Sequence, residues 1–339
     1  MALQSPPEQP MSDLESIQLI HQKKEILLKE IAKQIVGQKA VIEQLLICLL
    51  AGGHALIVGV PGLAKTLLIR TFSDILDLKF RRIQFTPDLM PSDITGTEVL
   101  YEDKTTGERK FRFIHGPLFA NIILADEINR TPPKTQAALL EAMQEQRVTT
   151  GGEDHPIEPP FFVLATQNPI EQEGTYPLPE AQLDRFMFQI NIEYPSSAEE
   201  AEIVKNTTSA YEAKPEKVVS AQDILQIQKL VRRVPVSDKV VDYAVSLVKA
   251  TRPQSDTSKP NELVDKYISW GAGPRASQYL ILAAKVRAML EGRASVSEDD
   301  VRTICEPVLR HRIITNYRAE ADRIPVAKII QSIVDQSIA

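Results

Sequence analysis

Short apolar runs alternate with amphipathic segments over the first two thirds of the chain. The runs carry β-branched or aromatic residues and are flanked by turn residues, which is typical of strands buried on both faces. Five runs fit this description: residues 54–60, 82–86, 122–126, 161–166 and 186–192. Between them, residues 38–51 and 133–146 place apolar side chains at helical spacing. The alternation predicts a parallel α/β sheet flanked by helices.

The pattern changes after Pro195. From there to the C-terminus we find only helical periodicity, which predicts an all-helical domain at residues 196–339 behind an α/β domain at residues 15–195. The predicted helices cover residues 199–209, 221–231, 237–249, 276–291 and 297–309 and the C-terminal segment. Residues 1–14 begin with a proline-containing stretch that has no apolar run, so we expect a disordered tail there.

Two insertions interrupt the α/β domain. Residues 97–115 and 147–161 both resemble hairpins, with turns expected at residues 105–107 and at Gly151-Gly152. Both tips are polar, so a plain surface loop and a functional hairpin are equally compatible with the pattern.

Composition narrows the possible functions. The 339 residues include 39 Lys plus Arg against 45 Asp plus Glu, a net charge of −6, which argues against a protein that mainly holds nucleic acid or anionic lipid. The two isolated cysteines, Cys48 and Cys305, provide neither a disulfide framework nor a zinc set. No secretory signal is present at the N-terminus, and the longest apolar region, residues 45–60, is broken by glycines. We therefore expect a cytoplasmic protein without membrane insertion.

One segment has the context of a phosphate-binding loop. Residues 59–66 read Gly-Val-Pro-Gly-Leu-Ala-Lys-Thr, follow an apolar strand and open a helix. Backbone N–H groups and the helix N-terminus favour a phosphate there. Lys65 would reach the β- and γ-phosphates, and the Thr66 hydroxyl would bind Mg²⁺. Ala64 stands where the strict pattern has glycine, and we expect it to be tolerated because its φ would be helical.

Polar side chains end two further predicted strands. Asp126 and Glu127 follow residues 122–125, and Asn168 follows residues 161–167. An aspartate beside a phosphate loop can hold Mg²⁺, and the next carboxylate can act as general base on the attacking water. An amide on the neighbouring strand can position that water. A solvated loop start explains the acidic pair if it is taken alone, but its pairing with the phosphate loop disfavours that reading.

Together these residues resemble the AAA+ ATPase superfamily, and several longer strings are similar to its MoxR branch. The strings are residues 35–38, 59–66, 85–96, 116–119, 126–130, 141–144, 165–169, 178–186 and 273–277. The resemblance runs from about residue 15 to the C-terminus. It implies an α/β P-loop NTPase core with a C-terminal all-helical lid domain, and ATP and Mg²⁺ as cofactors.

The resemblance also implies roles at matching positions. Residues that bind the nucleotide would be Ile35, Val36, Gly37, Gln38, Gly59, Val60, Pro61, Gly62, Leu63, Ala64, Lys65, Thr66 and Leu67. Thr66 and Asp126 would hold the metal. Glu127, Asn168, Arg185 and Arg275 would be catalytic, as base, sensor 1, arginine finger and sensor 2. The two hairpins would lie near a central pore. Whether Arg275 acts on its own nucleotide or a neighbour's, and whether Arg130 contacts the neighbouring subunit, stays open.

The arginines also have simpler interpretations. Arg185 could pair with Asp184 or Glu180, and Arg275 could be a surface residue after a Gly-Pro turn. The short basic runs at residues 81–82 and 311–312 favour a solvated face over a binding site. An arginine that acts on a neighbour's nucleotide needs a head-to-tail contact, and such contacts close into rings or run as spirals. We therefore expect a nucleotide-promoted homo-oligomeric ring, with six subunits as the implied number.

The function implied by the resemblance is an ATP-hydrolysing, chaperone-like ring that assembles or activates client protein complexes. Its usual helper is a protein with a von Willebrand factor A domain, which would be a separate chain. Two alternatives stay open: a DNA-stimulated motor, which the negative charge disfavours, and a nucleotide-gated scaffold with little hydrolysis, which the presence of Glu127, Asn168 and Arg185 disfavours.

Overall fold

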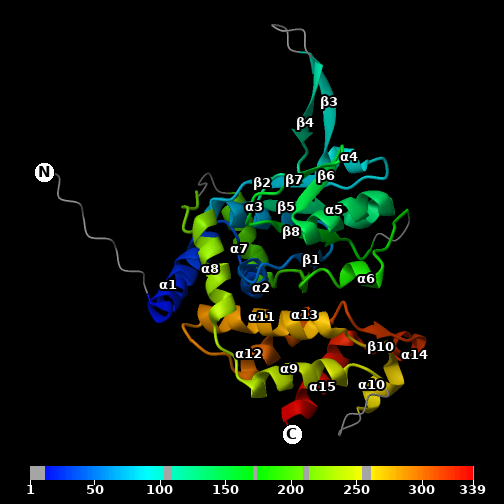
Figure 1. Ribbon diagram of the computed structural model, residues 1–339. Helices are drawn as coiled ribbons and strands as arrows, with labels where there is room; N and C mark the ends of the chain where they lie inside the picture. Colours follow the sequence, from blue (N-terminus) through cyan, green and yellow to red (C-terminus); the bar gives the residue numbers. More distant parts are fainter. Residues whose placement is uncertain (1–11, 103–108, 171–173, 209–213, 254–260, 339) are drawn as a thin grey trace, which may run out of the picture.

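A five-stranded parallel sheet forms the centre of the first domain (Figure 1). The computed structural model describes residues 12–102, 109–170, 174–208, 214–253 and 261–338. The strand order is β2-β5-β8-β1-β9. The strands are β1 (Ala55–Val58), β2 (Phe80–Gln84), β5 (Ile122–Asp126), β8 (Phe162–Gln167) and β9 (Phe188–Asn191). Every neighbouring pair is parallel, so the predicted parallel α/β sheet is confirmed. Because all carboxyl ends face one edge, the residues after β1, β5 and β8 meet there.

Helices flank this sheet. They are α1 (Asp13–Ala32), α2 (Lys39–Leu50), α3 (Lys65–Ile75), α4 (Pro91–Thr95), α5 (Pro133–Glu145), α6 (Glu180–Leu183) and α7 (Ser197–Thr207), with a 3₁₀ turn at Ile128–Arg130. Helix α1 begins at Asp13, so the last two residues of the tail predicted at residues 1–14 are helical. Ser12 is the N-cap, and its side chain and that of Glu15 each accept a hydrogen bond from the other residue's backbone N–H. Residues 1–11 lie outside the described residues.

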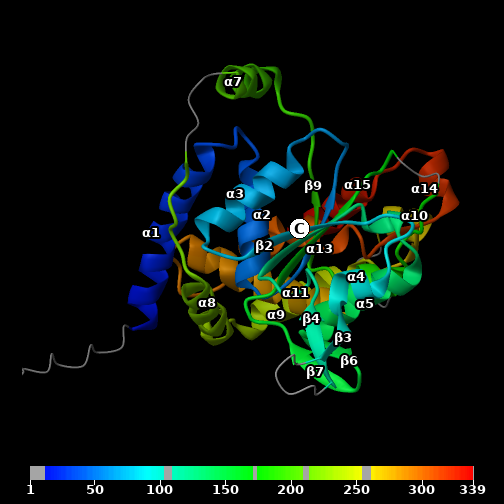
Figure 2. The same cartoon turned by 90° about the horizontal axis from the view of Figure 1, so that it is seen from above.

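The two predicted insertions are hairpins. β3 (Gly96–Glu102) pairs with β4 (Arg109–His115), and β6 (Arg147–Thr150) pairs with β7 (Glu153–Pro156). The expected turn at residues 105–107 lies outside the described residues. The hairpins touch one another, because the Phe113 and His155 rings stack with centroids 3.9 Å apart. Figure 2 shows both hairpins at one end of the core and α7 at the opposite end.

The lid follows the α/β domain and lies beneath the sheet in Figure 1. Its helices are α8 (Ala221–Arg233), α9 (Asp238–Ala250), α10 (Glu262–Tyr267), α11 (Pro274–Leu290), α12 (Glu298–Thr303), α13 (Cys305–Leu309), α14 (Tyr317–Ala321) and α15 (Val326–Ile338). The prediction of an all-helical lid is wrong in one respect: β10 (Ile268–Trp270) and β11 (Ile314–Thr315) pair antiparallel. These strands are too short to show a period of two. The domain division at residue 195 stays a prediction.

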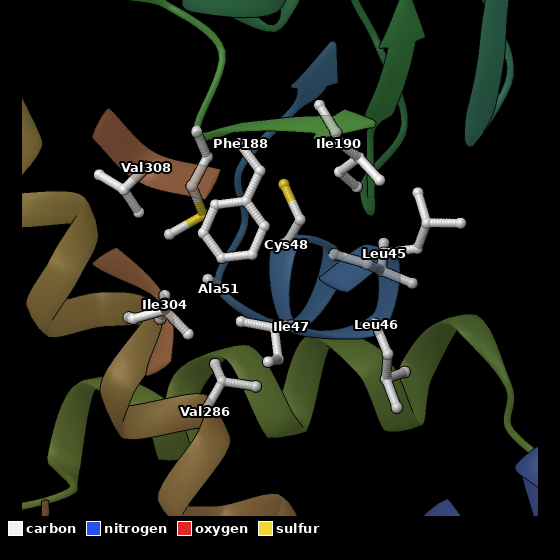
Figure 3. Close-up of a cluster of buried hydrophobic side chains, with 14 of the residues drawn as sticks. Leu45, Leu46, Ile47, Cys48, Ala51, Phe188, Ile190, Val286, Ile304 and Val308 are labelled. Atoms are coloured by element: carbon white, nitrogen blue, oxygen red, sulfur yellow. The ribbon is translucent and has the colours of Figure 1, made fainter. Parts of the chain in front are cut away.

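Core and lid share one hydrophobic interior. Figure 3 shows side chains of α2 and β9 packed against Val286 of α11 and against Ile304 and Val308, and these residues belong to one continuous buried cluster. Helix α2 is buried nearly all round: the six consecutive apolar residues from Leu45 to Leu50 are all buried, as are Val41 and Ile42. A displacement of the lid therefore acts directly on α2 and β9.

Candidate functional site

The phosphate loop joins β1 to α3. Gly62 has φ +88° with no atom near its Cβ position, which suits a close approach of backbone to ligand. A Cβ on Gly59 would lie 2.9 Å from the Ile192 carbonyl oxygen, so glycine is needed there for the close packing of the loop against the chain after β9. The expectation of a helical φ at Ala64 is wrong. Ala64 has φ +51° and ψ +27°, which is left-handed and costs an alanine about 1–2 kcal/mol. The loop therefore holds Ala64 in a strained conformation at the start of α3.

Lys65 begins α3 at the edge where the carboxyl ends of the strands meet. Its Nζ donates to the Gly59 carbonyl oxygen at 2.6 Å, across the loop. Burial lowers the pKa of Lys65, and the charges of Asp126 and Glu127 oppose this effect. The ammonium group is therefore half-buried beside two carboxylates, and it donates a hydrogen bond to a backbone carbonyl that a phosphate could replace.

A cavity of about 160 Å³ lies beside the loop, between the chain before α2 and helix α7. The sequence-predicted residues Ile35, Val36, Gln38, Gly62, Leu63, Ala64 and Leu67 line it, with Gln34, Leu68, Pro195, Ile203, Asn206 and Thr207. Gly37 has φ +68°, and a Cβ there would overlap the carboxylate of Glu199 in the first turn of α7. The lining is mainly apolar with a few polar groups, which suits a flat heterocycle.

Asp126 ends β5 as a largely buried carboxylate. Its Oδ1 accepts from the Thr166 hydroxyl at 2.6 Å, and its Oδ2 accepts two hydrogen bonds from the Arg82 guanidinium at 2.6 and 3.0 Å. Arg82 is still 47% exposed, which agrees with the solvated face expected for residues 81–82, and it pairs with Asp126 from that face. Thr166 also accepts from the backbone N–H of Glu127 at 2.8 Å, so one hydroxyl orients both acidic positions.

Glu127 occupies a strained position. Its φ of +57° and ψ of +49° are left-handed, which is uncommon for a glutamate and is frequent at functional sites. Gln84 on β2 donates to its Oε2 at 2.8 Å, and Arg130 lies 3.2 Å from the same oxygen. Arg130 thus contacts a carboxylate of its own chain. The Asn168 side chain is buried, and its Oδ1 accepts from the Ile170 N–H at 3.1 Å.

Arg185 lies elsewhere on the protomer. It lines a cleft of about 520 Å³ between α5, α6 and β6, with Glu141, Glu145, Arg147 and Gln182, and its NH1 donates to the Leu140 carbonyl oxygen at 2.6 Å. In Figures 1 and 2, α3 and α5 lie on different sides of the core. The structure thus separates the Arg185 cleft from the cavity beside α3.

Arg275 also differs from the simple expectation. It is not a free surface residue, because its NH1 donates to Asp184 Oδ2 at 3.0 Å. Asp184, which the sequence suggested as an ion-pair partner of Arg185, instead forms ion pairs with two arginines of the lid, Arg275 and Arg312. The interpretation of residues 311–312 as a solvated face is wrong for Arg312, whose side chain is 2% exposed.

The donor groups fit a magnesium nucleotide. Four features occur together: the apolar cavity, the glycines of the loop, the half-buried Lys65 and the acids at the end of β5. Thr66 lies in the first turn of α3. Asp126 Oδ1 accepts one hydrogen bond, from Thr166, and keeps a lone pair for a cation, whereas Oδ2 already accepts two hydrogen bonds from Arg82. Thr66 and Asp126 supply the oxygen ligands that Mg²⁺ prefers.

Comparisons with known proteins agree with this geometry. A model of the ATPase family associated with various cellular activities matches residues 54–188, and a model of the AAA lid domain matches residues 261–333. Over 315 residues the chain is 45% identical to "Chaperone MoxR1" of Mycobacterium tuberculosis, covering 91% of this chain and 80% of that protein. The chain belongs to the MoxR family of AAA+ ATPases. The predicted fold class is thereby confirmed.

Two further relatives support the assignment to the MoxR family. "Protein MoxR" of Methylorubrum extorquens is 31% identical over 294 residues, covering 84% of this chain and 85% of that protein. A solved structure of a candidate ATPase from Cytophaga hutchinsonii superposes with a TM-score of 0.85 at 42% identity, covering 95% of this chain and 96% of that chain. Among the helices in the described ranges, none is long and apolar enough to cross a bilayer.

Sequence reasoning missed Arg82, Gln84, Thr166 and Arg312. Gln84 and Arg82 alternate on β2, which pairs with β5 in the register Gln84–Asp126, so the strand assignment contained a usable signal. Thr166 likewise is the last buried residue of β8. Arg312 gave no such signal, because its partners lie about 128 residues away in the chain.

Proposed function

We propose that this chain hydrolyses ATP at a site shared between neighbouring protomers of a ring. The observation that carries the proposal is the cluster at the carboxyl ends of the strands. There the charges of Asp126 and Glu127 act on Lys65, beside an apolar cavity of about 160 Å³. Charged groups gathered in this way suit phosphoryl transfer, in which catalysis is mainly positioning and electrostatic stabilisation.

The residues act in distinct ways. The cavity would hold the base of ATP, and the loop N–H groups with Lys65 would hold the β- and γ-phosphates. Thr66 and Asp126 would hold Mg²⁺, which supplies charge neutralisation on the phosphate oxygens. Glu127 would take the proton of the attacking water as the water oxygen bonds to the γ-phosphorus and the bond to the bridging oxygen breaks, which gives ADP and phosphate. Asn168 would position that water.

Arg185 would act on the nucleotide of the adjoining protomer. Its position supports this role, because it lies in the cleft between α5, α6 and β6 and donates to the Leu140 carbonyl oxygen there, away from the phosphate loop of its own chain. A contact that joins two different surfaces of identical chains is head-to-tail and closes into a ring, which we propose to be hexameric. In other NTPases an arginine supplied in this way is worth roughly 10³–10⁵ in rate.

The cellular role that we propose is chaperone-like remodelling of protein complexes. The name of the relative "Chaperone MoxR1" supports it. Lid movement during the ATP cycle would act on client proteins, with a separate protein carrying a von Willebrand factor A domain as helper. A cytoplasmic location belongs to the same proposal.

Turnover measurements test the ATPase proposal. The wild type should release phosphate from ATP, Glu127→Gln should bind ATP but turn it over at least about 10²-fold more slowly, and Lys65→Ala should lose affinity for ATP. Glu25→Gln, an exposed carboxylate on α1, is the matched control and should behave as the wild type. Equal turnover by wild type and Glu127→Gln would contradict the base assignment. Turnover that rises strongly with DNA and falls with salt would instead favour a DNA motor.

A further inference from the structure

Four consecutive carbonyl groups around Arg185 accept hydrogen bonds from lid side chains. Arg312 donates to the carbonyl oxygens of Asp184, Phe186 and Met187 at 2.9, 2.6 and 3.2 Å. The hydroxyl of Tyr279 on α11 donates to the carbonyl oxygen of Arg185 itself at 3.2 Å. The segment that carries Arg185 is therefore fixed to the lid of its own protomer by its backbone, while the Arg185 side chain lies in the cleft and donates to the Leu140 carbonyl oxygen.

Arg312 is the centre of this contact. Its Nε donates to Asp184 Oδ1 at 2.7 Å, its NH1 also donates to the Val308 carbonyl oxygen, and its guanidinium carbon lies 5.1 Å from the centre of the Tyr279 ring. A buried charge is costly unless it is paired and fully hydrogen-bonded, and here every nitrogen of the fork has an acceptor. A planar guanidinium can serve several acceptors at fixed angles, whereas an ammonium group cannot.

Asp184 connects this contact to the start of α11. Its second oxygen accepts from Arg275 at 3.0 Å, at the start of α11, and α11 also carries Tyr279. If Arg275 leaves Asp184 for a phosphate, the charge balance at Asp184 and the position of α11 change together. Both changes reach the Arg185 backbone through contacts of 3.2 Å or less.

We propose that Arg312 is a positioning residue for Arg185: it couples the lid of one protomer to the arginine that this protomer presents to its neighbour's ATP. The inference rests on the proposed shared site. It deepens that proposal by stating how the nucleotide state of one protomer alters hydrolysis in the next. A rigid coupling is required because a misplacement of about 1 Å at a catalytic group can cost roughly 10²-fold in rate.

The test uses the full-length protein with two variants of different severity. Arg312→Lys keeps the positive charge but replaces the planar guanidinium with an ammonium group that cannot serve the same acceptors. Because Arg185 would then be less well positioned, kcat should fall about tenfold to a hundredfold. Tyr279→Phe removes one hydroxyl and kcat should fall about two- to tenfold. For both variants, the Kd for ATP and the nucleotide-bound oligomeric state should match the wild type. Arg293→Lys is the matched control, because it loses a comparable bidentate contact, to Asp300, inside the lid and away from Arg185.

A mixing experiment separates positioning from simple damage. Arg312→Lys subunits keep an intact Glu127, and Glu127→Gln subunits keep a well-placed Arg185, so mixing them should restore turnover as mixing Arg185→Ala with Glu127→Gln does. The double variant Arg185→Ala/Arg312→Lys should be no slower than Arg185→Ala alone.

Four outcomes overturn the inference. Rescue by the Arg185→Ala pair without rescue by the Arg312→Lys pair would show that Arg312 acts elsewhere. Additive losses in the double variant would show the same. If even the Arg185→Ala pair gives no rescue, the shared site fails and the inference fails with it. A weakened Kd for ATP in Tyr279→Phe would assign the contact to nucleotide binding instead.

Discussion

His54 provides a direct test of how the α/β domain is held together. The imidazole is buried between β8 and α5: its Nδ1 accepts from the Val163 N–H at 3.0 Å, and its Nε2 lies 3.2 Å from the Met143 carbonyl oxygen. These partners define a neutral ring with the proton on Nε2. Burial lowers the pKa of His54 from 6.5 to about 4, and the hydrogen bond to Met143 opposes this only partly.

The shift makes stability depend on pH in a definite direction. Below pH 6.5 His54 binds a proton in the unfolded chain but stays neutral in the folded protein. The contribution of neutral His54 to the free energy of unfolding is therefore complete above pH 6.5 and is lost as the pH falls toward 4. With these two pKa values, the linkage relation gives a loss of about 2 kcal/mol between pH 7.5 and pH 5.0.

The assay is urea unfolding followed by circular dichroism at both pH values for the wild type and His54→Gln. The variant cannot titrate at this position, so its free energy of unfolding should fall by about 2 kcal/mol less than that of the wild type. His311 titrates equally in both proteins and cancels from the comparison. Equal losses in the two proteins, or an NMR titration of His54 near pH 6.5, would refute the assignment.

Three further predictions concern the nucleotide site. Gly37→Ala should weaken ATP binding at least about tenfold, because a Cβ strains the left-handed backbone at φ +68° and displaces the Glu199 side chain, and calorimetry would measure it. Ala64→Gly should keep ATP affinity within about twofold while Ala64→Val loses it, since a β-branched residue resists the left-handed conformation; equal binding by both would contradict the strained loop. Gln84→Ala removes one of the two groups at Glu127 Oε2, leaving Arg130, and should raise basal phosphate release about two- to tenfold; unchanged release would show that the Gln84 contact does not restrain the base.

Local signals in the sequence predicted much of the fold. The strand of residues 122–126 was predicted with its observed bounds, and the helix of residues 133–146 ends one residue too late. Both succeed because apolar periodicity is a local property. The β10–β11 ribbon was missed because strands of three and two residues carry no periodicity.

The candidate site was predictable as far as it depends on short motifs. The loop and the acids after β5 come together as expected, because parallel strands bring their carboxyl ends to one edge. The left-handed φ of Ala64 was not predictable from the residue type, which disfavours it. The role of Arg312 was not predictable either. A short basic run reads the same in the sequence whether its arginine is exposed or buried, and the partners that bury Arg312 lie about 125 residues away in the chain.

The central claim is that each ATP lies where one protomer supplies the loop and the next supplies Arg185. Mixing Arg185→Ala with Glu127→Gln in equal amounts tests it most directly, since each variant alone should be nearly inactive. With random assembly, about one site in four joins an intact Glu127 to an intact Arg185, so phosphate release per site should recover to about a quarter of the wild-type rate. Release that stays at the level of the separate variants, although mixed oligomers form, would contradict the claim.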